Sequence, residues 1–576
     1  MLRLPHSLAA PADATMSPTR LSAVFLIFIA AHASGGVKAV AGVMPTAAST
    51  QGSPATPADE VDRIFAESTR DTPGCAVGLS RDEATVLLRG YGRASLEHDV
   101  PLTPDSVFEA GSVSKQFTAA AVLLLERDGL LRLDDAVHRH IPELPRSDPP
   151  ITIRQMLQHT SGLRDWGVLA GIAGWPRTTR VHSHRHVLDI VARQTVTNFA
   201  AGTRWSYTNT GYNLAAILVA RVSGQSFAAF TRTRLFEPLG MTRTSWRDDH
   251  RTVVQGRAVA HQASDGGFKT AMPFEDAHDN GGLLTTVGDL LIWARHLQRA
   301  SVDKDSSWLL TLQQPISFSG QRGAGYGLGL ELGARRGLRQ VDHSGSTAGY
   351  QAHLATYPEQ RIAVAVLCNV RSANPTLLAY AAADIFLASR AKLLSGPQEL
   401  IRPSADALDA LAGLYRSTQN GRAVRVARDG DALVVDGRGR LLAQSSMQFV
   451  TQYGQAWSFD GFGGLRVSDH VAEESFSRVL QASPTEAELL ALTGRYVNPE
   501  VETELTVRMV GPTLVIDRRP DSRFELRPLY ADAFNAGSLG TVVFRRGAGG
   551  EVTSMSIVDS RVWNLRFERH RAGQLQ

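Results

Sequence analysis

The sequence predicts an α/β (α+β) protein in which an antiparallel sheet flanked by helices is followed by two small antiparallel β-barrel domains. Long apolar runs such as Phe108–Leu125 indicate buried helices. The strongly alternating or apolar segments Gln351–Tyr357 and Arg361–Asn369 indicate neighbouring strands of the sheet. The tail repeats in register, with Leu408–Tyr415 matching Leu489–Tyr496 and Leu433–Asp436 matching Leu514–Asp517. Each copy spans under ~90 residues, which fits one small β-domain apiece.

Length and charge set the outer bounds of the prediction. A chain of 576 residues is expected to hold more than one domain, and we place these at 58–393, 405–483 and 485–576. The 60 basic and 56 acidic residues are spread along the chain without a basic block, so no nucleic-acid partner is expected.

The first 33 residues have the pattern of a secretory signal peptide. Arg20 precedes the apolar run Leu21–Ala31, and Ala31-His-Ala33 provides a small-x-small cleavage site. The run is shorter than the ~20 apolar residues that a membrane-spanning helix needs. We therefore expect a periplasmic or secreted protein without a stable membrane anchor, with a linker over residues 34–57 before the fold begins.

The chain contains two cysteines, Cys75 and Cys368, and both fall in apolar strand-like runs. Neither has an adjacent histidine or basic residue that would make it reactive. Two buried free thiols are the expectation, and a single disulfide is the alternative.

The first chemical motif is Ser112-x-x-Lys115, at the start of the most apolar helix. Residues three apart lie on the same face of a helix, so the Lys115 amine can reach the Ser112 hydroxyl. A serine hydroxyl needs a neighbouring base to become a nucleophile, and burial lowers the pKa of a lysine enough for it to serve. The pair is therefore a candidate nucleophile with its base.

The same spacing occurs at Ser301–Lys304 and Ser389–Lys392, but both lie in polar surroundings where the lysine keeps its charge. We interpret these two as structural.

The second motif is Tyr207-x-Asn209, in a loop before an apolar helix. A tyrosine hydroxyl beside a lysine can act as a base or proton shuttle, and an asparagine amide can hold a substrate carbonyl. Tyr496-x-Asn498 matches the same pattern, but we expect Tyr496 to be a core residue of a tail strand.

The third motif is His343-x-Gly345, which precedes the two strand segments of the sheet. We expect this segment to form a sheet edge that lines a cleft. The glycine lets a substrate backbone lie close to it, and His343 is expected to offer a hydrogen-bond donor or a cation at the rim.

The other histidines are interpreted as structural. His159 is expected to hold a loop, and the alternating cluster His182, His184 and His186 is rejected as a metal site because successive side chains diverge. No metal and no organic cofactor is predicted.

Ser-x-x-Lys, Tyr-x-Asn and His-x-Gly, in this order, resemble the penicillin-recognising serine hydrolases: class C β-lactamases, low-molecular-weight penicillin-binding proteins, D-aminopeptidases and related esterases. The resemblance covers roughly Ala58 to Arg390 and implies a β-lactamase/transpeptidase-like domain. It further implies the roles of five residues. Ser112 is the acylated nucleophile, Lys115 and Tyr207 form the proton-transfer pair, Asn209 positions substrate, and the N–H of Ser346 joins that of Ser112 in an oxyanion hole. Which member of the pair is the base stays open.

One departure concerns the substrate. β-Lactamases of this family typically have lysine where this chain has His343, and that lysine pairs with the substrate carboxylate. D-aminopeptidases and several esterases resemble this chain in having histidine there. A free carboxylate is therefore disfavoured, and a free amino end or an ester is favoured.

The tail is similar to that of the D-aminopeptidase subgroup, where two eight-stranded barrels follow the catalytic domain and a loop of the last barrel enters the cleft. By position that loop is Tyr530–Leu539, with Asp532 facing a substrate amine; the alternative is a solvated turn.

These features together predict a serine hydrolase acting through an acyl-enzyme, most simply a D-stereospecific aminopeptidase or amidase on short peptides or amides. A carboxylesterase or weak β-lactamase of the same family is the alternative. The non-enzymatic alternative is a penicillin- or peptidoglycan-binding protein with little turnover. The expected partner is a small peptide, amide or ester, and a homodimer is suggested only by the family likeness.

Overall fold

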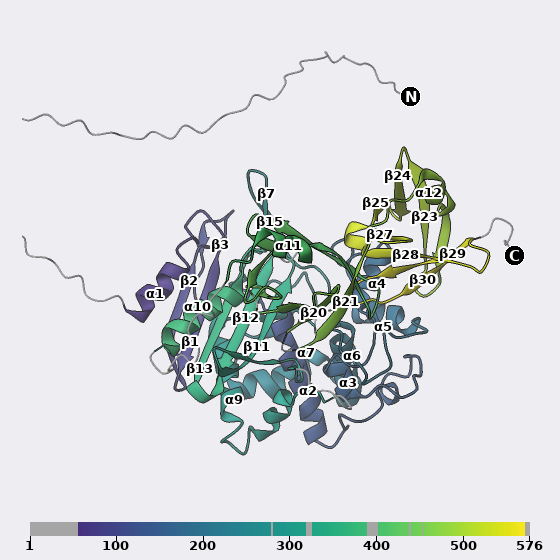
Figure 1. The fold of residues 1–576 in the computed structure, drawn as a ribbon. Coiled ribbons are helices and arrows are strands. Elements are labelled where there is room, and N and C mark those ends of the chain that lie inside the picture. Colours follow the sequence, from purple (N-terminus) through teal and green to yellow (C-terminus); the bar gives the residue numbers. More distant parts are fainter. Residues whose placement is uncertain are drawn as a thin grey trace, which may run out of the picture. The chain divides into compact units, whose positions relative to one another are not determined.

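The computed structural model describes residues 56–277, 280–317, 325–388, 401–436, 439–452, 454–469 and 471–570, which belong to one compact unit (Figure 1). The predicted signal peptide and nearly all of the predicted linker lie outside these residues.

A six-stranded antiparallel sheet in the order β10-β11-β12-β13-β1-β2 forms the centre of the first domain. Its strands are β1 (Cys75–Arg81), β2 (Ala84–Tyr91), β10 (Glu331–Arg335), β11 (Leu338–Thr347), β12 (Tyr350–Tyr357) and β13 (Ile362–Cys368). Alternate residues of β1 point to opposite faces, as the two-residue period of a strand requires. Val77 and Leu79 pack in one apolar cluster with α1 (Pro57–Ile64) and α10 (Pro375–Leu387). Ala76 belongs to a second cluster, which includes α9 (Val287–Arg299) (Figure 1).

The second cluster is built around α2 (Lys115–Arg127), which follows the 3₁₀ turn η1 (Gly111–Ser114). Every residue from Lys115 to Leu125 is buried, so the all-round apolar pattern of this segment correctly predicted a core helix. The helices α3 (Ile153–Leu157), α4 (Trp166–Ile172), α5 (His184–Ala192), α6 (Thr210–Ser223), α7 (Phe227–Thr231) and α8 (Glu237–Leu239) complete this part of the domain.

The strand that carries His343 is not the edge of the sheet, contrary to the expectation. β10 pairs with β11 from Glu331↔Asp342 to Arg335↔Leu338 and covers that side of β11. The pairing with β10 ends at Asp342, however, so residues 343–347 run past the end of the covering strand. Only this last part of β11 is open on the side away from β12.

Cys75 and Cys368 form a disulfide, which corrects the expectation of two free thiols. They are direct partners on the adjacent antiparallel strands β1 and β13, with their Cα atoms 4.0 Å apart. Nearly 300 residues separate them along the chain, so their pairing depends on the strand order of the sheet, which sequence spacing does not reveal.

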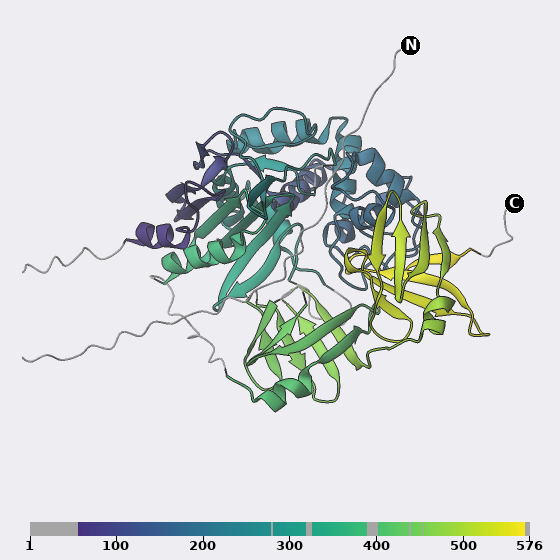
Figure 2. The same ribbon diagram turned by 90° about the horizontal axis from the view of Figure 1, so that it is seen from above.

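The tail contains two β-domains, each introduced by a short helix (Figure 2). The first begins with α11 (Ala405–Leu411) and is a closed eight-stranded barrel of β14 (Gly413–Ser417), β15 (Ala423–Asp429), β16 (Ala432–Val435), β17 (Gly439–Ala443), β18 (Gln448–Val450), β19 (Ala456–Phe459), β20 (Gly464–Ser468) and β21 (Glu473–Val479).

The second domain begins with α12 (Glu486–Ala491) and is a nine-stranded sheet in the order β25-β24-β23-β22-β30-β29-β28-β27-β26. Its strands are β22 (Gly494–Asn498), β23 (Thr503–Val510), β24 (Thr513–Arg518), β25 (Ser522–Glu525), β26 (Arg527–Pro528), β27 (Ala533–Asn535), β28 (Thr541–Arg546), β29 (Val552–Val558) and β30 (Leu565–Arg569). β25 and β26 lie at its two ends and are not paired, so this domain is a nearly closed barrel. The prediction of two small antiparallel β-barrel domains is confirmed.

The repeat seen in the sequence corresponds to equivalent structure in both β-domains. The Tyr415 hydroxyl donates to the Leu411 carbonyl at 2.8 Å, and the Tyr496 hydroxyl donates to the Leu492 carbonyl at 2.7 Å. Each tyrosine thus ties the first strand of its domain to the preceding helix, and Tyr496 is a core residue as predicted.

Within the described residues, no single helix is long and apolar enough to cross a membrane; α6 together with the segment Phe227–Leu239 reaches that length only across a bend of 79°.

Candidate active site

A cavity of about 820 Å³ brings together most of the residues that the sequence singled out. Six of the predicted site residues line it: Ser112, Tyr207, Asn209, His343, Gly345 and Ser346. Lys115 is fully buried, and its amine reaches the Ser112 side chain. Three motifs that span residues 112–345 of the chain therefore converge on one site.

Two glycines allow the end of β11 to press against the turn that carries Ser112. A Cβ on Gly111, whose φ is +53°, would lie 2.4 Å from the Ser346 nitrogen. A Cβ on Gly345 would lie 2.0 Å from the Ala110 oxygen and 3.0 Å from the Ser112 nitrogen. Only glycine fits these contacts. The close approach brings the backbone nitrogens of Ser112 and Ser346 to the same end of the cavity, where two N–H groups can act as an oxyanion hole.

The Lys115 amine has three neighbours, and they decide what it can do. Nζ lies 2.8 Å from the Asn280 carbonyl oxygen, 3.0 Å from Asn209 Oδ1 and 3.1 Å from Ser112 Oγ. The first two are acceptors and take both N–H bonds of a neutral amine. The third direction, toward the Ser112 hydroxyl, is then the lone pair. A neutral Lys115 is thereby oriented to accept the Ser112 proton.

Electrostatics favour that neutral form. Burial, and next the positive charge of Arg561, lower the pKa of Lys115 well below its usual value. The Tyr207 phenol responds in the opposite sense, because burial raises its pKa, although Arg561 and a hydrogen bond with Ser112 oppose the rise. The two shifts therefore favour loss of a proton from Lys115 over loss of a proton from Tyr207.

Asn209 is held by a residue that the sequence analysis missed. Its backbone N–H donates to Asp165 Oδ2 at 2.8 Å, while Asp165 Oδ1 caps α4 by accepting from Gly167 and Val168. Asn280 was also missed as a ligand of the amine, because it acts through its backbone carbonyl. The short strand β9 (Leu283–Thr285) pairs with β5 (Phe108–Glu109) and brings this segment beside Ser112.

His343 is buried and neutral, which differs from the donor or cation expected at the rim. Its exposed fraction is 2%, and burial lowers its pKa. Its Nε2 lies 3.0 Å from the Tyr326 hydroxyl and its Nδ1 lies 2.6 Å from the Ser344 carbonyl oxygen. Both ring nitrogens are engaged within the protein, so His343 shapes the cavity wall and has no free donor for a substrate carboxylate.

A chain of hydrogen bonds sets the proton positions around His343. The Thr208 N–H donates to His159 Nδ1 at 3.2 Å, so the proton of His159 sits on Nε2, which donates to the Tyr326 oxygen at 3.2 Å. Tyr326 then donates to His343 Nε2, and His343 donates through Nδ1 to Ser344. His159 is structural, as predicted, but it acts directly behind the cavity wall. No motif in the sequence pointed to Tyr326.

Replacing Tyr326 by phenylalanine is expected to lower kcat by about tenfold, with a stability loss of about 1–3 kcal/mol from two unpaired imidazoles. The physical reason is that His343 loses the donor that keeps its Nε2 unprotonated, so the ring can reorient beside Ser344. A new titration of His343 in the pH profile of kcat is the diagnostic measurement. Tyr357→Phe, on the neighbouring strand β12, is the matched control, because the buried Tyr357 hydroxyl has no hydrogen-bond partner among the described residues. An unchanged pH profile in Tyr326→Phe would contradict this role.

The second β-domain contributes to the cavity through a different loop from the one expected. Asp532 does not line the cavity: its carboxylate pairs with Arg546 at 2.8 Å inside its own domain. Arg561, in the β29–β30 loop, lines the cavity instead. Its guanidinium lies 4.8 Å from the centre of the Tyr207 ring and 3.8 Å from Asp165 Oδ2. An arginine therefore occupies the place where an acid was predicted.

The β29–β30 loop is docked on the first domain through its backbone. The Arg561 carbonyl accepts from Asn198 Nδ2 at 2.9 Å and from the Asp165 N–H at 3.3 Å. The Trp563 N–H donates to Asn198 Oδ1 at 2.8 Å. Backbone contacts of this kind leave no pattern in the side-chain sequence, which explains why the loop was not identified.

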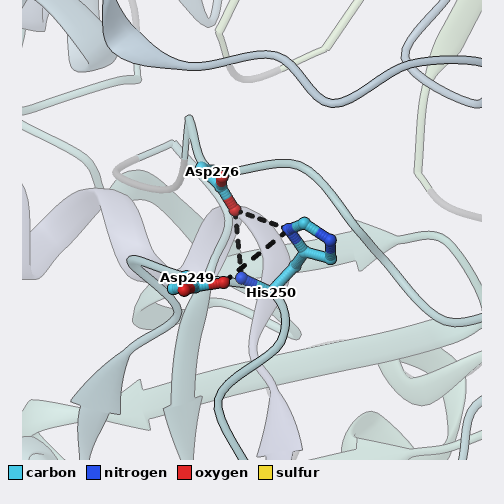
Figure 3. A group of neighbouring side chains, drawn as sticks. All are labelled: Asp249, His250 and Asp276. Atoms are coloured by element: carbon cyan, nitrogen blue, oxygen red, sulfur yellow. Dashed lines mark hydrogen bonds and ion pairs between the residues drawn. The ribbon is translucent and has the colours of Figure 1, made fainter.

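One trio of potential metal ligands lies outside this cavity. Ligand atoms of Asp249, His250 and Asp276 all fall within 4.8 Å of one another (Figure 3). His250 Nδ1 lies 2.9 Å from Asp276 Oδ1, and Arg251 pairs with Asp249 at 2.6 Å. Arg251 balances the charge of Asp249, and His250 contacts Asp276 through both its ring and its backbone N–H. In the rejected cluster, His186 Nδ1 accepts from the Ser183 N–H at the start of α5, a capping role.

The fold and the convergence of Ser112, Lys115 and Tyr207 define a protein of the β-lactamase type. A family model described as beta-lactamase matches residues 61–388, and the chain belongs to that family.

Within this family, the chain is similar to several individual proteins. The chain is 28% identical over 354 residues to a D-aminopeptidase of Gluconobacter oxydans, covering 62% of this chain and 65% of that protein, slightly less than two thirds. It is 26% identical over 513 residues to a D-aminopeptidase of Brucella anthropi, covering 84% of this chain and 93% of that one. The solved structure of an octameric penicillin-binding protein homologue from Pyrococcus abyssi shares the fold, with a TM-score of 0.51, 21% identity, and coverage of 81% and 98%.

Proposed function

We propose that this chain is a serine hydrolase that cleaves short peptides or amides of D-amino acids through an acyl-enzyme. The relatives named D-aminopeptidase support the substrate class. The observation that carries the chemistry is the Lys115 amine, whose N–H bonds are taken by Asn209 and Asn280 while its remaining direction points at Ser112 Oγ.

In the proposed mechanism, Lys115 Nζ takes the proton of Ser112 as Oγ attacks the carbonyl carbon of the scissile bond. The negative charge that develops on the carbonyl oxygen is stabilised by the N–H groups of Ser112 and Ser346. The proton passes from Lys115 through the Tyr207 phenol to the departing amine, and the C–N bond breaks. This leaves an ester between the acyl group and Ser112.

Deacylation follows the same path in reverse. A water molecule attacks the ester carbon, and its one proton passes by way of the Tyr207 phenol to the Lys115 amine. The acid product leaves and the proton returns to Ser112 Oγ. Asn209, with Oδ1 engaged by the amine, keeps its NH₂ group available to bind a substrate carbonyl.

The charge of the cavity supports a second candidate, the hydrolysis of D-peptides that retain a free carboxylate. Arg371 and Arg561 line the cavity, and Arg371 has no ion-pair partner among the described residues. Glu331 is the one carboxylate among the described lining residues. The expectation against a free carboxylate rested on the missing lysine at His343, and these arginines provide other cations.

The test compares D- and L-alanine p-nitroanilide, p-nitrophenyl butyrate, nitrocefin and a D-Ala-D-Ala peptide on the wild-type protein and on Ser112→Ala. We expect D-anilide turnover well above that of the L-isomer, abolished in Ser112→Ala, and an acyl adduct on the Ser112 peptide by mass spectrometry. Faster release from the D-Ala-D-Ala peptide would select the second candidate. Turnover that survives in folded Ser112→Ala would refute both.

We also propose that the protein is exported to an oxidising compartment. The Cys75–Cys368 disulfide supports this, because such bonds form and persist outside the reducing cytosol. Cell fractionation with N-terminal sequencing of the mature protein tests the predicted cleavage after Ala33. The proposed homodimer is tested by light scattering during size-exclusion chromatography.

A further inference from the structure

A second cavity, of about 810 Å³, lies where the first domain meets both β-domains. We call it the junction cavity. The first domain contributes the segment 196–198, the first β-domain contributes β14 and the turn 418–421, and the second contributes β28, β29 and the end of the β29–β30 loop. It is nearly as large as the catalytic cavity, and none of the predicted site residues line it.

The lining of the junction cavity is cationic. Arg164, Arg416 and Arg545 line it, and no Asp or Glu does so among the described residues. Arg164 is neutralised by Glu500 at 2.7 Å. Arg416 stacks over the Tyr530 ring at 4.9 Å, and Arg545 donates to Ser556 Oγ at 3.3 Å and to Asn564 Oδ1 at 2.6 Å. Neither Arg416 nor Arg545 has an ion-pair partner in the part of the chain that the structure describes.

Neighbouring arginines on or beside the same strands do have ion-pair partners. Arg546, the next residue after Arg545, pairs with Asp532, and Arg422, at the far end of the same turn as Arg416, pairs with Glu474. Arg546 and Arg422 are thus balanced by acids, whereas Arg416 and Arg545, which line the junction cavity, are not.

Two unbalanced guanidinium groups in one recess repel each other. Both lie close enough to Tyr530 to oppose the rise in its pKa that burial causes. A planar guanidinium with free N–H groups is the side chain best suited to bind a carboxylate, often through two parallel hydrogen bonds. The arrangement is therefore one that an incoming anion would stabilise.

The remaining lining fits an organic anion rather than a bare ion. The turn after β14 contributes Thr418, Gln419 and Asn420, which offer hydroxyl and amide groups, and Trp563 and Tyr530 provide apolar rings. Cavities of ~300–1,000 Å³ with a few placed polar groups are typical of small-molecule sites. We propose that the junction cavity binds a small carboxylate-bearing ligand, held by Arg416 and Arg545.

The site is linked to the catalytic cavity by a single loop. Trp563 and Asn564 line the junction cavity, while Arg561 of the same loop lines the catalytic cavity. Asn198 bonds to the loop on both sides, to the Arg561 carbonyl and to the Trp563 N–H. A ligand that draws Arg545 away from Asn564 changes the support of this loop, and through Arg561 it changes the surroundings of Tyr207 and Lys115. Occupancy of the junction cavity is expected to alter turnover.

The experiment measures binding of N-acetylglutamate to the full chain by calorimetry, with N-acetylglutamine amide as the uncharged probe. Glucuronate, a sugar acid, forms a parallel arm that separates a peptide-like from a sugar-like ligand. We expect the acid of one arm to bind with Kd in the micromolar to about millimolar range, more weakly as salt rises, and the amide not to bind. No binding by either acid at about 10 mM overturns the proposal.

Substitutions test whether the acid binds in the junction cavity. The double variant Arg416→Met/Arg545→Met is expected to weaken binding at least about tenfold while basal anilide turnover persists. Asn420→Asp, which adds one negative charge to the lining, is expected to weaken it as well and serves if the double variant does not fold. Arg466→Met/Arg523→Met removes two exposed, ion-paired arginines from the same β-domains and is the matched control. Binding that survives the first two variants but is lost in Arg561→Met belongs to the catalytic cavity and overturns the proposal.

Turnover tests the link between the cavities. Saturating probe is expected to change kcat/KM for the anilide at least about twofold in the wild-type protein and not in Arg416→Met/Arg545→Met. Binding with unchanged kinetics contradicts the link through the loop. Failure of all turnover would instead concern the proposed hydrolase, because binding is measured independently of catalysis.

Discussion

Lys115→Met is expected to lower kcat/KM for the preferred amide by about 10³- to 10⁴-fold while the protein stays folded. The buried amine is the group placed to take the proton of Ser112, at 3.1 Å from its Oγ. A methionine has a similar length and adapts to the same apolar space, although it also removes the hydrogen bonds to Asn209 and Asn280, so folding is checked alongside activity. Steady-state kinetics with circular dichroism as the folding control is the measurement.

The chain provides a matched control for this substitution. Lys304 also follows a serine at the same spacing, but it is exposed, and Lys304→Met is expected to leave kcat/KM unchanged. Comparable activity in Lys115→Met and Lys304→Met would contradict the assignment of the base.

The pH profile of the wild-type protein tests the same assignment. Burial and Arg561 lower the pKa of Lys115, so the amine loses its proton well below the usual pH of a lysine. Only the neutral amine accepts the Ser112 proton, and activity is therefore expected to fall as pH drops through this lowered pKa. Above it, activity stays level until the Tyr207 phenol, whose pKa is raised, begins to ionise. An acid limb near pH 10 would contradict a buried neutral lysine.

Gly345→Ala is expected to lower kcat by about 10²- to 10³-fold, the effect of losing one oxyanion-hole donor. The added Cβ would lie 2.0 Å from the Ala110 oxygen and 3.0 Å from the Ser112 nitrogen, and both of these are backbone atoms. The end of β11 must therefore move away from the turn, which separates the N–H groups of Ser112 and Ser346. Overpacking of this kind also costs about 1–3 kcal/mol of the free energy of unfolding.

Gly171→Ala in α4 is the control, since a Cβ there meets no heavy atom within 4 Å. It is expected to leave kcat unchanged and to raise stability slightly, because alanine is the better helix former. Stability and kcat are measured together by urea unfolding and steady-state kinetics. A folded Gly345→Ala protein with full kcat would show that the contact between the end of β11 and the turn carrying Ser112 does not form the oxyanion hole.

Much of the candidate site was predictable because each motif is local. Ser112 and Lys115 are three residues apart and need only a helical turn to meet, and the apolar run that follows them predicts burial of the lysine. Tyr207 with Asn209, and His343 with Gly345, are equally short patterns. The tail repeat was visible for the same reason, since Tyr415 and Tyr496 perform one local task in each β-domain.

The features that the sequence did not predict depend on which distant segments of the chain become neighbours in the fold. Cys75 and Cys368 form a disulfide because their strands are adjacent. His343 has no free ring nitrogen because Tyr326 and Ser344 bond to both. Arg561, rather than Asp532, lines the catalytic cavity. By itself the sequence determined the helical and strand patterns and the family, and it predicted the residues that carry the reacting groups. The tertiary structure decided the directions of the Lys115 and Tyr207 pKa shifts, the contact of the Lys115 amine with Asn280 and the charge of both cavities. These properties arise from burial and from contacts between residues hundreds of positions apart, which no local spacing encodes.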